Sequence, residues 1–352
     1  MEILNAIKII GPTTFSFFIG ILITPIVTHY LYSKSIWKKR SGNTHGLGDN
    51  KGTPIFNELH KEREVKTPRM GGLVIVLSVF ITIGIFWLLS YLDSGGPSGK
   101  IDFLSRTQTW LPLAGFLIGS IVGFIEDLVV VSTSPRFPDG LPFQYRVLPI
   151  LVFGAFAAWW FYAKLGMSEV FVPFYGHIDL GIWFIPFFLV VLLAVLASGV
   201  IDGIDGLSGG VLATVFSALG IIAAFHSQID LSAFSFVIVG GLLAFLWFNI
   251  PPARFYMTEV GFMPLAVALT IIAFLTDTVL LLPIIACIQF VTVTTNIMQV
   301  ASKKFRGKKI FLVAPIHHHF EAIGWPPYKV VMRYWVISII CATIGVLLAL
   351  LG

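Results

Sequence analysis

Long, uninterrupted apolar stretches constrain this chain more than any other feature of its sequence. Hydrophobic residues make up 57% of the 352 residues, and charged residues only 12%. A water-soluble domain usually has about 25% charged residues. A helix needs roughly 20 apolar residues to cross the hydrocarbon core of a bilayer. The sequence therefore predicts an all-α integral membrane protein, with a single domain over residues 1–352.

About ten stretches are apolar throughout and long enough to be transmembrane helices. They are Thr14–Tyr32, Gly71–Leu92, Trp110–Leu128, Val147–Leu165, Ile182–Ala197, Gly206–Phe225, Phe234–Phe248, Phe262–Thr276, Val279–Met298 and Val330–Leu351. The loop after the fifth stretch is polar and glycine-rich, whereas the segment Val170–Tyr175 before it is β-branched and aromatic and predicts a small surface hairpin.

Basic residues are concentrated in the loops on one side of the predicted membrane. The first and last of these loops carry Lys34, Lys38, Lys39, Arg40, Lys51, Lys61, Arg63, Lys66, Arg69, Lys303, Lys304, Arg306, Lys308, Lys309 and Lys329. The opposite side holds only Lys8, Lys100, Arg106 and Lys164. Because cytoplasmic loops carry the excess of Lys and Arg, this placement predicts that the basic loops are cytoplasmic and that both termini are extracytoplasmic.

Polar motifs from five separate loops fall on the predicted cytoplasmic side. They are Lys66–Gly72, Glu126-Asp127, the loop with Asp202 and Asp205, Asn249–Gly261 and His317–His319. A transporter more often places its polar groups near the bilayer midplane, on broken helices. The pattern therefore favours an active site at the cytoplasmic face of the membrane.

The stretch from Ser198 to Gly210 places two aspartates and several glycines between two apolar runs. Carboxylates at a membrane edge are costly without a partner, and they usually face a wet cavity or a bound cation. Glycines let the backbone approach a ligand closely. If the next span is helical from about Asp202, then Asp202 and Asp205 lie on one face of it. The alternative is a solvated loop whose two aspartates cap a helix.

Two further acidic motifs follow apolar spans. Glu126 and Asp127 end the third span, where both carboxylates can reach a metal, although a solvated helix end is an equal alternative. The segment Asn249–Gly261 contains two prolines that forbid a continued helix, so it presents Arg254 and Glu259 on an irregular loop. A single glutamate in such a loop would be unremarkable.

Three consecutive histidines, His317–His319, form the rarest pattern in the chain. They could bind a metal or donate hydrogen bonds to an anion. A zinc site typically uses wider spacings and more cysteine, so phosphate or substrate contacts are favoured. Carboxylates and basic groups at a membrane surface suit phosphoryl transfer, in which carboxylates hold Mg²⁺ and cationic side chains neutralise phosphate oxygens.

From about Thr67 to the C-terminus, these motifs resemble the bacterial phospho-N-acetylmuramoyl-pentapeptide transferases. This family lies within the polyprenyl-phosphate N-acetylhexosamine-1-phosphate transferase superfamily. The resemblance is strongest over Arg306–Ser338, and it extends to Thr67–Gly72, Asp202–Leu207 and Phe248–Ala253. The triple-histidine block is more typical of this branch than of its sugar-phosphate relatives.

The resemblance implies a ten-span fold in the bacterial plasma (inner) membrane. It also implies Mg²⁺-dependent transfer of phospho-N-acetylmuramoyl-pentapeptide from a UDP-linked donor to undecaprenyl phosphate, with UMP as the second product. The expected partners are these two substrates and membrane lipid, with no nucleic acid. Family members are commonly homodimers, so a homodimer is one assembly to expect.

The family's site residues can be carried over to this chain by resemblance. Asp127 and Glu126 would handle the lipid phosphate nucleophile, and Glu259 would bind Mg²⁺, with Asp127 as a second candidate metal ligand. Tyr256 would stack on uracil in a nucleotide pocket that Asp202 and Asp205 line. The remaining candidates are His317 and His318 as catalytic residues, and Thr67, Gly203, Gly206, Asn249, Arg254, Gln299 and His319 as substrate-binding residues.

The chain also departs from the family pattern. Glu126-Asp127 stands where the family has Asp-Asp, and Tyr256-Met-Thr-Glu259 stands where it has Phe-Met-Gly-Asp. Glutamate is longer by one methylene, so a metal must sit differently or the backbone must shift. Retention of both carboxylates indicates a co-adjusted site. The rivals are a related transferase using another UDP-sugar, which the histidine block disfavours, and a catalytically silent homologue that binds lipid or partner proteins, which the changed acids favour.

Overall fold

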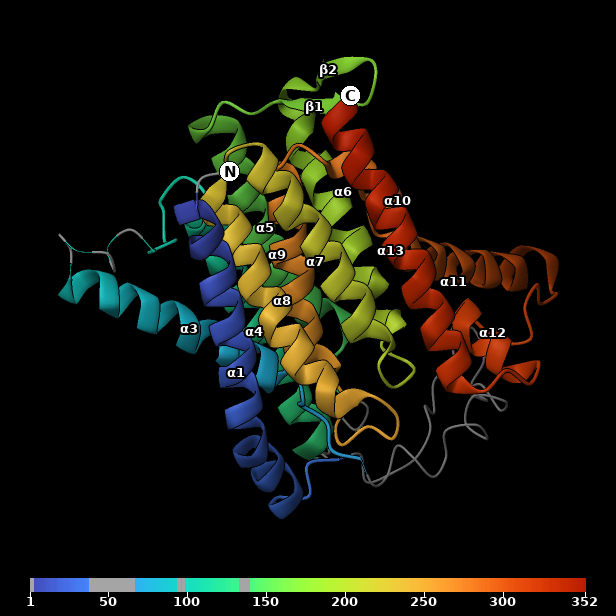
Figure 1. The fold of residues 1–352 in the computed structure, drawn as a ribbon. Helices are drawn as coiled ribbons and strands as arrows, with labels where there is room; N and C mark the ends of the chain where they lie inside the picture. The colour runs from blue at the N-terminus through green and yellow to red at the C-terminus, as the bar shows by residue number, and fades with distance from the viewer. Residues whose placement is uncertain (1–2, 38–66, 94–95, 97–98, 100, 133–139) are drawn as a thin grey trace.

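A computed structural model describes residues 3–37, 67–93, 96, 99, 101–132 and 140–352, and over these residues the chain is almost wholly helical (Figure 1). The basic residues from Lys38 to Lys66, on which the predicted orientation partly depends, lie outside the described residues. The prediction of an all-α membrane protein is confirmed by the nine helical spans, within the described residues, that are long and apolar enough to cross a membrane.

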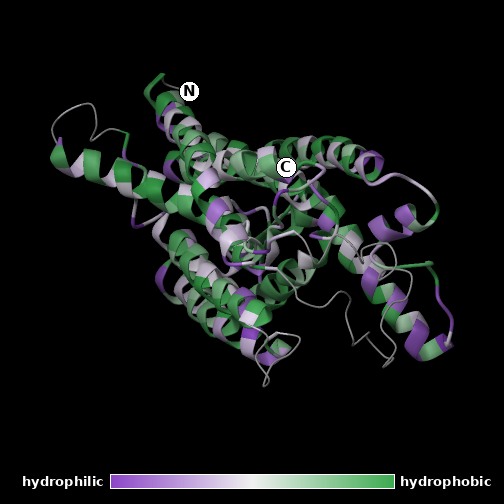
Figure 2. Cartoon of the chain, turned by 90° about the horizontal axis from the view of Figure 1, so that it is seen from below, coloured by the Kyte–Doolittle hydropathy of each residue, from purple (hydrophilic) through white to green (hydrophobic). Residues whose placement is uncertain are grey.

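The helices follow the predicted apolar stretches closely. The long ones are α1 (Ile3–Ser33), α3 (Leu73–Leu92), α4 (Trp110–Ser132), α5 (Phe143–Lys164), α6 (Phe184–Ala197), α7 (Leu207–Phe225), α8 (Ile229–Asn249), α9 (Thr258–Leu275) and α13 (Pro327–Leu351). Short 3-10 turns, η2 (Gly181–Trp183) and η3 (Ser198–Ile201), extend α6 at both ends. Figure 2 shows hydrophobic residues along most of these helices, as expected for surfaces that face lipid.

The predicted span Val279–Met298 is not one straight helix. The chain forms η4 (Val279–Leu281) and α10 (Leu282–Ile285), then bends by 87° into α11 (Cys287–Arg306). The bend occurs because Ala286 has φ −106° and ψ 40°, outside the helical region. In α11 the buried face is polar, with Gln289, Thr292 and Thr295, while the outer face is apolar. Figure 1 shows α11 projecting sideways from the bundle.

Helix α9 lies at the centre of the bundle. Of the described spans it is the most completely buried, followed by α7 and α8, whereas α1 and α13 bury only a small share of their residues. Phe216 of α7 and Phe245 of α8 are fully buried, as is Leu265 of α9. The core is therefore built from helices that have protein on nearly all sides, and the first turn of α9 reaches one end of this core.

The two ends of the bundle differ in character. Strands β1 (Glu169–Val172) and β2 (Gly176–Asp179) form the predicted hairpin at the end where both chain termini lie (Figure 1). The other end carries the loops between α6 and α7 and between α8 and α9, together with α12 (Ile316–Ala322). The polar motifs identified in the sequence thus gather at the end opposite the hairpin.

One condition and one local prediction were not met. The helix after the acidic loop begins at Leu207, as the predicted span Gly206–Phe225 implies, and not near Asp202, because Gly206 takes a left-handed conformation with φ 80°. Asp202 and Asp205 therefore lie in a loop and do not share a helix face. Helix α4 continues to Ser132, so Glu126 and Asp127 lie inside the helix rather than at its end.

Candidate active site

A stripe of glycines lets α4 pack closely against α9. An added Cβ would lie 2.6 Å from the backbone of Pro264 at Gly119, and 2.2 Å from the carbonyl oxygen of Glu259 at Gly123. Small residues four apart allow two helix backbones to approach in this way. This packing places the next turn of α4, which carries Glu126 and Asp127, beside the first turn of α9.

Asp127 is completely buried, and both of its carboxylate oxygens are engaged. The guanidinium of Arg69 lies 3.0 Å from Oδ1. Oδ2 accepts hydrogen bonds from the Thr258 hydroxyl at 2.6 Å and from the Val260 backbone N–H at 2.9 Å. Burial lowers the pKa of Arg69, but the charge of Asp127 and its hydrogen bond raise that pKa by more than burial lowers it. The net pKa lies above the ordinary value, so Arg69 remains a cation. Asp127 thus joins three segments that are far apart in the sequence.

A second arginine links the other two carboxylates. Nη1 of Arg146, in the first turn of α5, lies 3.5 Å from Oε1 of Glu126 and 3.2 Å from Oε1 of Glu259. The Leu141 backbone N–H donates to Oε2 of Glu126 at 2.9 Å. Glu126 has a side-chain exposure of 5% and Glu259 of 31%, so Glu259 is the carboxylate that a ligand can reach.

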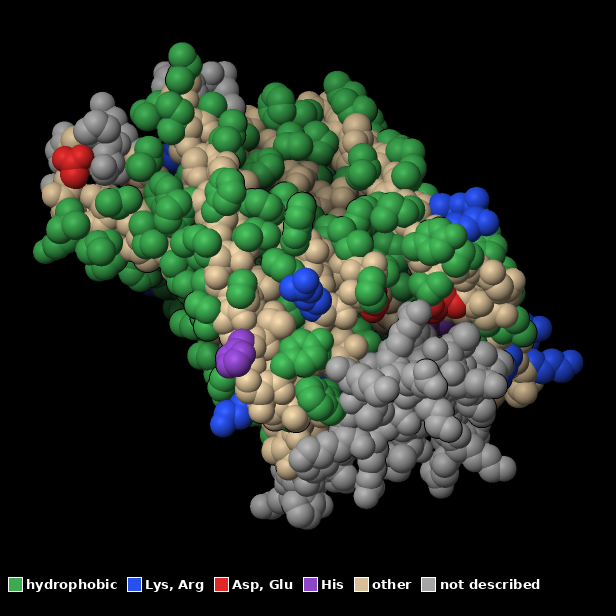
Figure 3. All heavy atoms as spheres, turned by 60° about the horizontal axis from the view of Figure 1, so that its bottom comes forward, with side chains coloured by type: hydrophobic (Ala, Val, Ile, Leu, Met, Phe, Trp, Pro, Cys, Tyr) green, Lys and Arg blue, Asp and Glu red, His purple; other side chains and the backbone are tan. Residues whose placement is uncertain are grey.

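Arg146 was not singled out by the sequence analysis. Its only signal is that it stands directly before the apolar stretch of the fourth span, where an ionisable residue is costly without a partner. We call Arg69, Glu126, Asp127, Arg146 and Glu259 the charged cluster. Figure 3 shows acidic and basic side chains together on this face of the molecule.

Asp202 and Asp205 fix the α6–α7 loop against the loop that precedes α9. Asp202 accepts hydrogen bonds from the Ser208 hydroxyl at 2.6 Å and from the Thr258 backbone N–H at 3.0 Å. Burial raises the pKa of Asp202 by more than these hydrogen bonds lower it. Asp205 accepts a hydrogen bond from the Ala253 backbone N–H at 3.1 Å. Asp202 is therefore linked to Asp127 of the charged cluster through Thr258, which hydrogen-bonds to both.

Asn249 and Gly206 are held together at the other side of this loop. Oδ1 of Asn249 accepts from the Gly206 N–H at 2.9 Å, and Nδ2 of Asn249 donates to the Phe255 carbonyl at 2.8 Å. The indole of Trp335 donates to the Gly206 carbonyl at 3.1 Å. Because Asn249 is only 2% exposed, its side chain connects two backbone segments and thereby shapes the site from behind.

The histidine block lies against the acidic loop. His317 and His318 are buried, and an added Cβ at Gly203 would lie 2.5 Å from Nε2 of His318. Glu321 lies 2.7 Å from Nδ1 of His318, which fixes that ring. His319 is half-buried, and its Nδ1 accepts from the Leu312 N–H at 3.3 Å. The structure thus brings Gly203 together with two of the three histidines.

The other sequence candidates surround this region. Both ends of the Gln299 amide bond to the backbone of residues 310 and 311. Arg254 is exposed, and its guanidinium lies 5.4 Å from the ring centre of Phe248. Tyr256 is half-buried, and its backbone pairs with Pro68 and Gly71 of the loop that begins at the half-buried Thr67.

The carboxylate oxygens of the charged cluster suit a hard cation as ligands. In the structure, however, Arg69 and Arg146 hold these carboxylates. Within the described residues, no three His, Cys, Asp or Glu side chains are arranged to hold a metal ion. The carboxylates meet arginines instead of converging on one point. Glu259 also meets Arg146 through its Oε1, but its Oε2 accepts no hydrogen bond from the described part of the chain. Carboxylate oxygens are the ligands that Mg²⁺ prefers.

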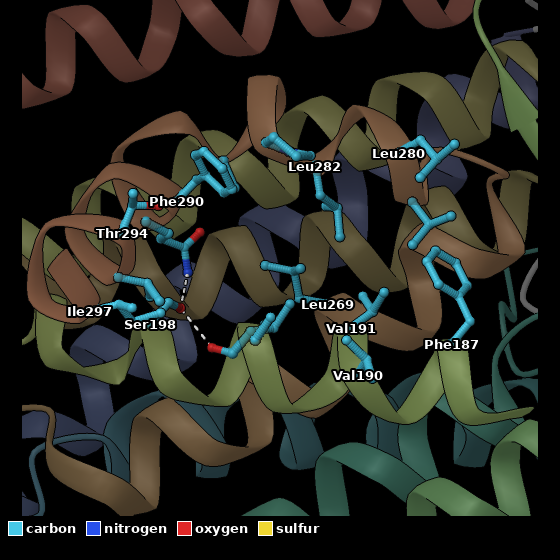
Figure 4. Close-up of a pocket in the computed structure, with 17 residues that line it drawn as sticks. Phe187, Val190, Val191, Ser198, Leu269, Leu280, Leu282, Phe290, Thr294 and Ile297 are labelled. Atoms are coloured by element: carbon cyan, nitrogen blue, oxygen red, sulfur yellow. Dashed lines mark hydrogen bonds between the residues drawn. The ribbon is translucent and has the colours of Figure 1, made fainter. Parts of the chain in front are cut away.

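An apolar groove runs between α6, α9, α10 and α11 (Figure 4). It has a volume of about 360 Å³ and is lined by residues such as Phe187, Val191 and Leu269. Phe290 and Ile297 on its α11 side are more than half exposed, so the groove opens laterally toward the bilayer. One end of the groove reaches Ser198, whose 3-10 turn leads directly to Asp202.

Comparison with known proteins decides the family. Residues 109–277 match the model of glycosyl transferase family 4. The phospho-N-acetylmuramoyl-pentapeptide-transferase of Clostridium perfringens is 31% identical over 97% of both chains. The chain belongs to the phospho-N-acetylmuramoyl-pentapeptide transferase family. Two further enzymes of that name agree with this assignment. The one from Chloroflexus aurantiacus is 30% identical over 90% of this chain and 85% of the relative. The one from Anoxybacillus flavithermus is 33% identical over 84% of this chain and 88% of the relative.

Membership of the phospho-N-acetylmuramoyl-pentapeptide transferase family confirms the resemblance found in the sequence. Together with the apolar spans, it identifies the chain as a transferase and a multi-pass protein of the bacterial plasma membrane. The relatives cover the full span of the charged cluster, from Arg69 to Glu259. The roles of the individual residues in that cluster have to be argued from their geometry.

Proposed function

We propose that this chain transfers phospho-N-acetylmuramoyl-pentapeptide from its UDP-linked donor to undecaprenyl phosphate. The observation that carries the proposal is the charged cluster, in which α4, α5, α9 and the loop before α3 bring three carboxylates and two arginines together at one end of an apolar bundle. A phosphate-bearing lipid and a water-soluble nucleotide donor can both reach such a site.

In the proposed reaction, an oxygen of the lipid phosphate attacks the donor phosphorus that carries the sugar. The bond from that phosphorus to the bridging oxygen breaks, and the oxygen leaves with UMP. Phosphoryl transfer depends mainly on positioning and on neutralising charge. Arg69 and Arg146 supply fixed positive charge, and the Nε–H of each is buried without an acceptor among the described residues. The side chains of Arg69 and Arg146 are 19% and 28% exposed, so part of each guanidinium can face a phosphate oxygen.

We further propose that the site uses Mg²⁺. Glu259 would be the principal ligand because it is the exposed carboxylate, with Asp127 as the second, since each carboxylate oxygen has more than one lone-pair site. The ion would offset the negative charge of the two phosphates. The arginine bridge has a consequence for this assignment: Arg146 and the metal would share the Glu259 carboxylate.

The apolar groove is the proposed location of the polyprenyl chain. Its walls bear almost only apolar side chains, and its lateral opening matches a substrate that arrives from the bilayer. The end near Ser198 would bring the lipid phosphate toward Asp202 and the charged cluster. His317 and His318, which lie behind Gly203, would orient the donor side of the site together with the neighbouring His319.

The proposal also carries an orientation and an assembly. The excess of Lys and Arg in the loops at the cluster's end would place the charged cluster at the cytoplasmic face and both termini outside. Lys303, Lys304 and Arg306, in the last turn of α11, are part of this basic excess. A homodimer is proposed from the family resemblance only.

The test is an assay of the purified protein with UDP-muramoyl-pentapeptide and undecaprenyl phosphate, with and without Mg²⁺, that follows UMP release. We expect UMP and a lipid-linked muramoyl product only when both substrates and Mg²⁺ are present. Turnover of another UDP-sugar in place of the muramoyl donor would support the related-transferase alternative. Failure to release UMP from any donor, with the protein folded, would support the silent homologue.

A further inference from the structure

Thr258, the first residue of α9, has a backbone conformation that its side chain disfavours. Its φ is +55°, in the left-handed region. A β-branched residue there is a genuine outlier, and such a conformation persists only when the surroundings enforce it. Glycine adopts this conformation without the steric cost. A strained threonine calls for a compensating interaction.

The threonine side chain provides that interaction. Its hydroxyl donates to Oδ2 of Asp127 at 2.6 Å and accepts from the backbone N–H of Met70 at 3.1 Å. The Thr258 backbone N–H donates to Asp202 at 3.0 Å. One residue therefore contacts the loop before α3, which carries Arg69, helix α4, which carries Asp127, and the α6–α7 loop, which carries Asp202.

These contacts set the orientation of two carboxylates. Without the hydroxyl, Oδ2 of Asp127 would keep only the Val260 N–H, and the carboxylate could turn about its link to Arg69. Glu259 directly follows Thr258, so the strained backbone also determines the direction in which Glu259 leaves the helix toward Arg146. Any rotation at Thr258 would move both groups together.

We propose that Thr258 is a positioning residue, whose hydroxyl fixes the Asp127 carboxylate and whose left-handed backbone directs Glu259 into the site. This inference deepens the proposed transferase function and rests on it for its kinetic test. Thr258 touches the carboxylates rather than the substrates, so its loss should lower kcat while leaving the KM for the UDP-linked donor nearly unchanged.

Three variants separate the hydroxyl from the strain. Thr258→Ser keeps the hydroxyl, Thr258→Val keeps the shape and the strain without the hydroxyl, and Thr258→Gly removes both. We expect Thr258→Ser to retain near-parental kcat, and Thr258→Val and Thr258→Gly to lose about 10- to 100-fold, as expected when a reacting group is misplaced by about 1 Å. Thr258→Gly should nevertheless melt at or above the temperature of Thr258→Val, because glycine is not strained there.

The matched control is Thr270→Val, which removes the hydroxyl of another α9 threonine that bonds only to its own helix, at Ala266. Its kcat should equal that of the parent. Full activity in Thr258→Gly, or a Thr258→Ser variant as poor as Thr258→Val, would overturn the positioning role. If the parent itself fails to turn over these substrates, the proposed function fails instead. Equal melting temperatures for Thr258→Ser and Thr258→Val would then refute the hydroxyl's part in holding Asp127.

Discussion

Shortening Glu259 by one methylene tests whether the charged cluster is tuned to glutamate. The Glu259→Asp variant restores the usual family residue but withdraws the carboxylate by about 1.5 Å, the length of one carbon–carbon bond. The 3.2 Å contact between Oε1 and Nη1 of Arg146 would then lengthen to roughly 4.7 Å, beyond hydrogen-bond reach. The side chain remains charged, so any effect comes from position rather than from the loss of an acid.

Stability and turnover should respond very differently to this change. Arg146 and Glu259 are both about 30% exposed, with values of 28% and 31%, so their ion pair is worth only about 0.2–1 kcal/mol. The melting temperature should barely move. Displacement of a reacting group by about 1 Å or more can cost on the order of 100-fold in rate. We therefore expect an aspartate variant that is stable and strongly impaired, with partial rescue at raised Mg²⁺.

The measurement is UMP release over a range of Mg²⁺ concentrations, with the melting temperature recorded for every variant. Glu169→Asp is the matched control, because it removes a methylene from an exposed glutamate in β1, at the opposite end of the bundle. Glu259→Gln should abolish turnover, since an amide oxygen lacks the charge that a hard cation prefers. An aspartate variant as active as the parent would show that the site is not tuned to glutamate. A glutamine variant with normal activity would refute the metal assignment.

Three further outcomes follow from the packing and the topology. Gly123→Ala places a Cβ 2.2 Å from the Glu259 carbonyl and should lower stability by about 1–3 kcal/mol together with turnover. Gly84→Ala, with open space around its Cβ inside α3, should lower neither, because alanine is favoured over glycine in a helix. Asn249→Ala leaves the Gly206 N–H and the Phe255 carbonyl without their partner, which should lower the free energy of unfolding by about 1–3 kcal/mol for each group. A melting temperature equal to the parent's would contradict the role of Asn249 in joining these two segments. The orientation can be tested with a cysteine at the exposed Lys308, in a protein from which the two native cysteines have been removed. In intact cells a membrane-impermeant thiol reagent should not label this cysteine, and labelling from outside would contradict the proposed orientation.

The helical spans could be predicted from the sequence because membrane helices are defined by local, continuous apolarity. The same signal placed the polar motifs at one end of the bundle, since the chain alternates direction at every span. The break at Ala286 was missed because the stretch from Val279 to Met298 is apolar enough on average, while the backbone conformation of one alanine leaves no trace in composition. The polar face of α11 contains the better signal, with Gln289 and Thr292 three residues apart.

The contacts within the charged cluster could not be predicted from local patterns. Arg69 and Asp127 are 58 residues apart, and Thr258 is 131 residues from Asp127. They meet only because α4 packs on α9 and the loop before α3 pairs with the backbone that precedes α9. Each carboxylate was recognisable as costly at a membrane edge. Their partners were not, because a single arginine such as Arg146 resembles any basic residue next to a transmembrane span. The acidic motifs were thus found from the sequence, and their pairing required the fold.

The lateral opening of the groove bears on how the enzyme would treat lipids of different length. Val190, Phe290 and Ile297 lie along its edge and are each more than half exposed, so nothing in the described walls closes the groove on the bilayer side. In the proposed arrangement, only the isoprene units nearest the phosphate would contact protein, and the rest would stay among the lipid tails. Extra units beyond the groove would gain no contacts and meet no wall. Polyprenyl phosphates long enough to fill the groove should therefore serve equally well as acceptors, and discrimination should begin only when the chain becomes shorter than the groove itself.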